Sequence, residues 1–177
     1  IKNIMQDLYI GDVGKGFPLV LIHGFLGSSE IWEPQIKFFK NNFRVITPDL
    51  PGFGKSNNIK SHNSIKSISN LLLSCLEKKK INKFNLLGHS MGGMIVQEMA
   101  KKAKDNISKL ICYSTGPRGQ MPGRFETVDQ SRENLKKKGL ETLVKNIVKT
   151  WFIKKEEAKY FKKCIEVGKL TSVEAAD

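Results

Sequence analysis

Short apolar runs alternate with amphipathic segments along the first two thirds of the chain. Residues 19–22 form a continuous apolar run, a pattern typical of a strand that is buried on both faces in a parallel sheet. Similar runs predict strands at residues 43–46, 84–87 and 110–113. Residues 7–11 alternate between polar and apolar, which predicts an earlier strand followed by a turn from Asp12 to Gly16.

The segments between these strands have helical periodicity. Residues 31–39 predict a short helix, and residues 91–103 predict a longer one. Between them, apolar residues from Ile65 to Leu76 recur at helical spacing, with Ser61 or Ser64 as the N-cap. Strands that alternate with helices imply right-handed crossovers, so we expect an α/β fold with a doubly wound, mostly parallel sheet.

The pattern changes after Pro117. Two helical stripes follow, at residues 140–151 and 158–165, and no strand is predicted. We therefore divide the chain into an α/β core at residues 1–117 and a helical segment at residues 118–177. The apolar residues of the first stripe, at 140–151, are expected mainly to pack in a hydrophobic core, and some of them to line a substrate pocket.

Charge modifies this picture little. The 177 residues include 30 Lys and Arg and 17 Asp and Glu, a net charge of +13. The lysine runs at 78–80 and 136–138 have no interleaved aromatic residues or arginines. They indicate solvated helix faces, not a nucleic-acid interface, although a basic surface attracts anionic substrates or carriers at long range.

Cysteine content and hydropathy indicate a cytoplasmic protein. Cys75, Cys112 and Cys164 are far apart and outside zinc-ligand spacing, which favours free thiols in a reducing compartment. No apolar stretch is long enough for a membrane span, and residues 1–7 contain no apolar signal region. Position 1 is not Met, so the chain is expected to be trimmed or incomplete there; the pattern specifies no oligomeric state.

The motif with the clearest chemistry is Gly88-His89-Ser90-Met91-Gly92, which fits G-x-S-x-G. It lies between a predicted strand and a predicted helix, as a nucleophile elbow requires. The serine of such an elbow has strained backbone angles, so residues two positions away on each side must be small. The turn directs Ser90 above the carboxyl ends of the strands, where open α/β sheets bind ligands.

A nucleotide cofactor is not expected. Gly54-Lys55-Ser56 would end a P-loop only if position 49 were glycine, and it is Asp49. Gly52-Phe53-Gly54 lacks the spacing of a dinucleotide fingerprint. Neither a metal nor an organic cofactor is implied.

Three sequence blocks resemble the α/β-hydrolase superfamily in order and separation. They are residues 23–28 (His-Gly-Phe-Leu-Gly-Ser), 49–56 (Asp-Leu-Pro-Gly-Phe-Gly-Lys-Ser) and 88–93 (Gly-His-Ser-Met-Gly-Gly). The resemblance covers residues from about 7 to 116, and the helical segment after it is similar to the cap of many members. It implies an α/β-hydrolase fold with a cap and an enzyme similar to serine esterases and lactonases. The blocks do not fix the subfamily, because similar ones occur in thioesterases, carbon–carbon bond hydrolases and cofactor-free perhydrolases.

The resemblance also implies roles for individual residues. Ser90 would attack a carbonyl and form an acyl-enzyme, and the backbone N–H groups of Phe25 and Met91 would form the oxyanion hole. His23 and Gly24 would shape the loop that presents Phe25. We interpret Asp49 as a structural turn residue.

The catalytic triad of such an enzyme, formed by a serine, an acid and a histidine, is incomplete in residues 1–177. Members of the superfamily have the order Ser, acid, His, whereas the three histidines here, His23, His62 and His89, all precede Ser90. Asp177 follows a helix and is a poor candidate for the acid. We expect the acid and the histidine beyond residue 177, together with the last core strands, so that the sheet is left with an open edge.

The leading interpretation is a serine hydrolase that cleaves a small ester, lactone, thioester or related acyl compound. One alternative is a non-catalytic module that uses the fold to bind a ligand; a strained serine argues against it. Another is a lyase of the menaquinone-synthesis type, since residues 23–28 are similar to those of such relatives.

Overall fold

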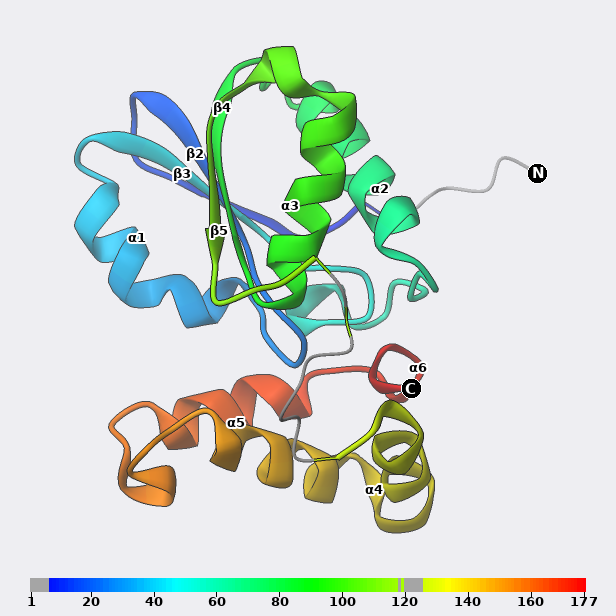
Figure 1. The fold of residues 1–177 in the computed structure, drawn as a ribbon. Coiled ribbons are helices and arrows are strands. Elements are labelled where there is room, and N and C mark those ends of the chain that lie inside the picture. The colour runs from blue at the N-terminus through cyan, green and yellow to red at the C-terminus, as the bar shows by residue number, and fades with distance from the viewer. Residues whose placement is uncertain (1–6, 118, 120–125) are drawn as a thin grey trace.

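The computed structural model describes residues 7–117, 119 and 126–177. At its centre is a five-stranded sheet (Figure 1). The strands are β1 (Ile10–Val13), β2 (Phe17–Ile22), β3 (Phe43–Pro48), β4 (Phe84–His89) and β5 (Ile107–Tyr113). Their order is β1-β3-β2-β4-β5, and only the β1–β3 pair is antiparallel. The predicted doubly wound, mostly parallel sheet is therefore confirmed.

Helices cover the two faces of the sheet unequally. On one face, α2 (Ile65–Lys78) and α3 (Met91–Lys102) pack side by side over an apolar cluster that includes strand residues Val20, Ile46 and Leu86 (Figure 1). On the other face lies the shorter α1 (Glu33–Phe39), with a smaller cluster around Trp32. The connections in the described ranges include short 3-10 helices: η1 (Ser29–Trp32), η2 (Gly54–Ser56), η3 (Lys104–Asn106) and η4 (Lys155–Glu157).

Two local details refine the predictions. Ser64, and not Ser61, caps α2, because its hydroxyl accepts the N–H of Ser67 at 3.2 Å. The predicted bounds of the first strand were wrong: β1 begins three residues later and includes Asp12, which the sequence placed in a turn. Asp12 is held in the strand by its ion pair with Arg44 on the antiparallel neighbour β3.

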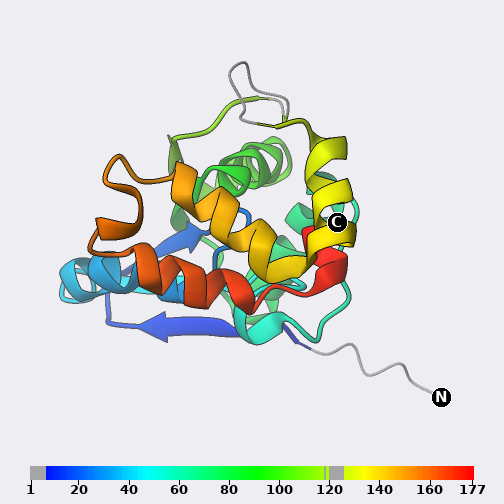
Figure 2. The same ribbon diagram turned by 90° about the horizontal axis from the view of Figure 1, so that it is seen from below.

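Residues 126–177 form a separate helical layer. It contains α4 (Val128–Thr150), α5 (Phe161–Lys169) and α6 (Val173–Ala176), and it lies across the carboxyl ends of the strands (Figures 1 and 2). As predicted, no strand occurs among residues 126–177. Helix α4 is longer than its apolar stripe indicated, because a capping box of Thr127 and Gln130 starts it early and it continues past a break at Gly139 (φ 77°).

The layer is attached to the sheet at several points. Leu26, from the loop after β2, is completely buried in the apolar cluster of α4 and α5. The N–H of Ser172 donates to the carbonyl of Gly52 at 2.7 Å, and Lys163 forms an ion pair with Glu30. These contacts fix the helices over the edge of the sheet at which β4 ends.

Strand β5 lies at the end of the sheet order, and its side chains are poorly covered. Ile111 is 44% exposed and Tyr113 is 61% exposed, although strand residues of this kind are normally buried in a parallel sheet. Its outer backbone edge pairs with no strand in the described part of the chain, which agrees with the predicted open edge.

The described helices include none with the length and hydropathy to cross a membrane.

Candidate functional site

Ser90 lies at the sharp turn between β4 and α3. Its backbone angles are φ 55° and ψ −121°, a conformation that costs a non-glycine residue on the order of 1–3 kcal/mol. A hydrogen bond from β5 helps to stabilise this conformation: the Ser90 N–H donates to the carbonyl of Tyr113 at 3.1 Å. The predicted strand–turn–helix setting of the G-x-S-x-G motif is thus present.

Glycines allow the backbone to approach this turn closely. A Cβ atom at Gly24 would lie 2.9 Å from Ser90 Cβ and 3.0 Å from the carbonyl oxygen of His89. A Cβ atom at Gly88 would overlap the backbone carbonyl of Gly92. Both residues therefore have to be glycine for the loop after β2 and the first turn of α3 to meet at Ser90.

The hydroxyl group of Ser90 is not used as a helix cap. Ser90 occupies the N-cap position of α3, but its side chain forms no capping hydrogen bond. A serine whose role was capping would accept an N–H from the first turn of its helix. The side chain instead faces a cavity.

The cavity lies between the carboxyl edge of the sheet and the helical layer, and its volume is about 1040 Å³. Its wall is mainly apolar. From the core it includes Phe25, Ile65, Met91 and Met94, and from the helical layer it includes Val128, Leu143 and Ile147 of α4 and its C-cap residue Trp151. The volume and the apolar wall are those of a small-molecule binding site.

Two charged residues belong to the wall of the cavity. They already contact each other, because Arg132 Nε donates to the backbone carbonyl of Asp177 at 2.6 Å. Arg132 on α4 is thereby joined to the end of α6. Four further residues contribute hydroxyl groups to the wall: Ser114, Thr115, Ser131 and Thr150.

The two predicted oxyanion residues, Phe25 and Met91, lie on the same cavity as Ser90. In the described part of the chain, neither of their backbone N–H groups donates to a backbone carbonyl. Met91 is the first residue of α3, so its N–H lies at the positive end of a 12-residue helix. The arrangement favours negative charge beside Ser90.

His23 is completely buried beneath this site, and both of its ring nitrogens have partners. Nε2 accepts the N–H of Leu50 at 3.0 Å, and Nδ1 lies 2.8 Å from the carbonyl of Gly24, to which it donates. Desolvation by burial lowers the pKa of His23 to about 4. The ring is therefore neutral at pH 7 and joins two loops, with no free nitrogen to act as a base.

Asp49 is likewise completely buried, and its carboxylate joins loops. It accepts the N–H of Ser29, and its second oxygen accepts the N–H of Lys55 at 2.8 Å. Asp49 thus holds the turn after β2 against the turn after β3.

The remaining histidines do not line the cavity. His89 packs against Trp32 and Tyr113 on the α1 face of the sheet, with ring centroids 6.4 and 5.6 Å apart, and burial lowers its pKa. His62 lies in the loop before α2 and is also absent from the cavity wall. Among the described residues, no group of three His, Cys, Asp or Glu side chains is arranged to hold a metal ion.

One residue of the site was not singled out from the sequence. Thr115 follows β5, lines the cavity, and donates its hydroxyl hydrogen to the carbonyl of Ser90 at 2.6 Å. The contact joins residues 25 positions apart, so no local pattern indicates it. The only signal was that Ser114-Thr115-Gly116 follows a predicted parallel strand.

Comparisons with known proteins show the family of this chain. The model of the alpha/beta hydrolase fold family matches residues 18–153. The chain is 30% identical over 139 residues, 78% of its length, to (E)-2-((N-methylformamido)methylene)succinate hydrolase of Acinetobacter baylyi. It is 32% identical, over the same share, to the pimeloyl-[acyl-carrier protein] methyl ester esterase of Pseudoalteromonas atlantica.

The fold agrees with a solved structure as well. A crystal structure from work on carboxylesterases of Nitrososphaera gargenis superposes with a TM-score of 0.80 and 27% identity, covering 96% of this chain and 65% of the other. The chain spans about half the length of the two curated relatives, 52% and 51%. Since the family model spans more than half of the 177 residues, the chain belongs to the alpha/beta hydrolase fold family.

Proposed function

We propose that this chain carries the nucleophile, the oxyanion hole and the substrate pocket of a serine hydrolase that cleaves a small ester, lactone, thioester or related acyl compound. The observation that carries the proposal is the strained backbone of Ser90, whose hydroxyl group forms no helix-capping hydrogen bond and which lines a cavity of about 1040 Å³. A protein that only bound a ligand would gain nothing from this strain.

In the proposed reaction, Ser90 Oγ attacks the carbonyl carbon of the substrate and the leaving group departs, which gives an acyl-enzyme that water then hydrolyses. The N–H groups of Phe25 and Met91 donate to the oxyanion of each tetrahedral intermediate. Gly24 leaves room for the Phe25 loop beside Ser90, and His23 holds that loop in place.

The base that activates Ser90 is proposed to come from outside residues 1–177. The reason is the geometry of the three histidines: both nitrogens of His23 are engaged, His89 faces α1, and His62 is absent from the cavity wall. A histidine beyond residue 177, oriented by a carboxylate from the same region, would complete the triad.

Helices α4 to α6 are proposed to act as a cap that sets the shape of the substrate. The apolar part of their wall is formed by Leu143 and Ile147, one turn apart on α4, and by Trp151, the C-cap residue of α4. An apolar acyl group fits this wall. Two relatives act on an acyl-carrier-protein methyl ester and on a succinate derivative, which supports acyl chemistry at this site.

A fluorophosphonate probe tests the proposal, because it reacts with an exposed serine that is activated by a base beside oxyanion donors. The intact protein should be labelled at Ser90, and Ser90→Ala should lose both labelling and ester turnover. Ser74→Ala, on the exposed side of α2, is the control and should keep both.

Two results would count against the proposal. Labelling at another serine would show that the elbow is not the active site. Equal labelling rates for residues 1–177 alone and for the intact protein would show that His23, His62 or His89 supplies the base.

A further inference from the structure

Thr115 holds the peptide unit that joins Ser90 to Met91. The carbonyl oxygen of this unit accepts two hydrogen bonds, from the Thr115 hydroxyl at 2.6 Å and from the Gly93 N–H at 2.8 Å. Its N–H is that of Met91, the proposed oxyanion donor. We infer that Thr115 is a positioning residue for the oxyanion hole, an inference that rests on the proposed function.

The rigidity of the peptide bond links the Ser90 carbonyl to the Met91 N–H. The C=O and N–H of a trans peptide lie in one plane and point in opposite directions. A group that fixes the carbonyl oxygen of Ser90 therefore fixes the direction of the Met91 N–H on the other side of the plane. Hydrogen bonds to a carbonyl also polarise its peptide unit and make the N–H a stronger donor.

The second bond to this carbonyl cannot replace the first. The Gly93 N–H belongs to the first turn of α3 and moves with that helix, so it does not fix the peptide against the rest of the site. Thr115 comes from the end of β5, a different element, and joins the peptide to the sheet. The Ser90 N–H is held from the same place, by the carbonyl of Tyr113.

The position of Thr115 is itself closely defined. A Cβ atom at Gly93 would lie 2.5 Å from Thr115 Cβ, so the threonine side chain fills the space that this glycine leaves. Ser114 has φ 47°, a left-handed conformation that turns the chain back toward Ser90 directly after β5. Gln97 Nε2 donates to the carbonyls of Gly93 and Gly116, at 3.0 and 3.4 Å, and so joins α3 to the same loop.

The test compares substitutions that differ in hydrogen-bonding strength. In the intact protein, Thr115→Ser keeps the hydroxyl and should retain kcat within about 3-fold, whereas Thr115→Ala removes it. We expect Thr115→Ala to lower kcat about 10-fold with little change in KM, less than the 10²–10³ that follows loss of an oxyanion donor. Thr115→Cys, with a weak S–H donor, should fall between them, and it replaces the alanine variant if that variant does not fold.

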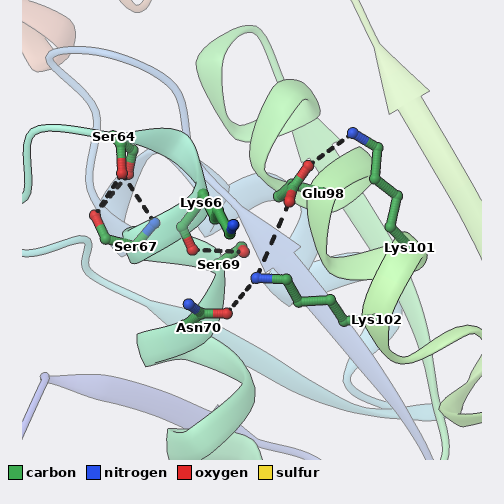
Figure 3. Close-up of polar contacts among 8 residues, drawn as sticks. All are labelled: Ser64, Lys66, Ser67, Ser69, Asn70, Glu98, Lys101 and Lys102. Carbon is green, nitrogen blue, oxygen red and sulfur yellow. Dashed lines mark hydrogen bonds and ion pairs between the residues drawn. The ribbon is translucent and has the colours of Figure 1, made fainter.

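Ser69→Ala is the matched control for stability. Ser69 is completely buried in α2, and its hydroxyl also donates to a backbone carbonyl, that of Lys66 at 3.0 Å (Figure 3). Its hydroxyl bonds within α2, whereas that of Thr115 bonds to Ser90. Ser69→Ala should lower the free energy of unfolding and leave kcat unchanged, so a loss of kcat in Thr115→Ala at equal stability supports positioning.

The NMR resonance of the Met91 amide separates this inference from the proposed function. It should shift in Thr115→Ala or Thr115→Cys and stay near its native position in Thr115→Ser, whether or not the protein hydrolyses the ester that is offered. An unshifted Met91 amide, or equal kcat for the serine variant and a variant without the hydroxyl, would overturn the role of Thr115. An inactive native protein with a shifted Met91 amide would contradict the proposed function and leave the positioning role supported.

Discussion

The ring of His23 accepts the backbone N–H of Leu50 at Nε2, at a distance of 3.0 Å, and both residues are completely buried. This bond joins the loop after β2, which presents Phe25, to the loop after β3. It requires an unprotonated Nε2, so the connection depends on the charge state of the ring.

The stability of the protein should therefore depend on pH through His23. Its pKa is about 4 in the folded state and about 6.5 in an unfolded chain, so below pH 6.5 the unfolded state binds the proton first. The stabilisation is complete above pH 6.5 and is lost as the pH falls toward 4, by roughly 3 kcal/mol in total. Urea denaturation at pH 7 and pH 5 measures the effect.

His89 contributes in the same direction, because burial also lowers its pKa. The difference between the native protein and His23→Ala isolates the contribution of His23, and His62→Ala serves as the control. If His23→Ala does not fold, NMR titration of the His23 imidazole in the native protein tests the same prediction. A pKa near 6.5 would contradict the structure.

Asp49→Ala should destabilise the protein without removing any group from the cavity. The backbone N–H groups of Ser29 and Lys55 would lose their acceptor, at a cost of roughly 1–3 kcal/mol each. Asp49→Asn keeps one acceptor oxygen, so its free energy of unfolding should fall by about half as much as that of Asp49→Ala. Urea midpoints measure the difference, and equal midpoints for the native protein and the alanine variant would be evidence against the role of Asp49.

Gly24→Ala should disable Ser90 and leave the fold intact. The new methyl group would lie 2.9 Å from Ser90 Cβ and would displace the loop that carries the Phe25 N–H, so fluorophosphonate labelling should fall about 10²-fold. Gly11→Ala is the matched control, because its methyl group would crowd Thr47 in the distant β1–β3 pair. Normal labelling of Gly24→Ala would show that the loop does not contribute a donor.

Trp151→Ala should change the choice of substrate. Trp151 lines the cavity but is 43% exposed, so its removal should not unfold α4. Packing of the indole ring against a long acyl chain stabilises the complex by about 1–2 kcal/mol, so kcat/KM for an octanoyl ester should fall about 10-fold and that for an acetyl ester little. The neighbouring Ile153, which is fully exposed, provides the control Ile153→Ala. Unchanged chain-length preference in Trp151→Ala would contradict the proposed cap.

The elements of this protein were largely predictable from local patterns. Strands β2 to β4 and helices α2 and α3 were indicated within a few residues, because each apolar run or stripe reflects the burial of its own segment. Strand β5 and helix α1 were indicated as closely, although the side chains of β5 are largely exposed and α1 has no fully buried residue. The elbow was equally local, since the requirement for small residues around Ser90 acts over two positions on each side. The bounds of β1 were missed because its ion pair with Arg44 depends on a neighbouring strand.

The tertiary structure alone decided how the site is held together. His23 and Asp49 were predicted to be structural, but the atoms that they bind, in Leu50 and Lys55, follow from packing one loop on another. Thr115 contacts the Ser90 carbonyl across 25 positions of the chain. Such contacts leave no periodic trace in a sequence, because they depend on which strands become neighbours, whereas burial of a strand or a helix face repeats at the period of the element itself.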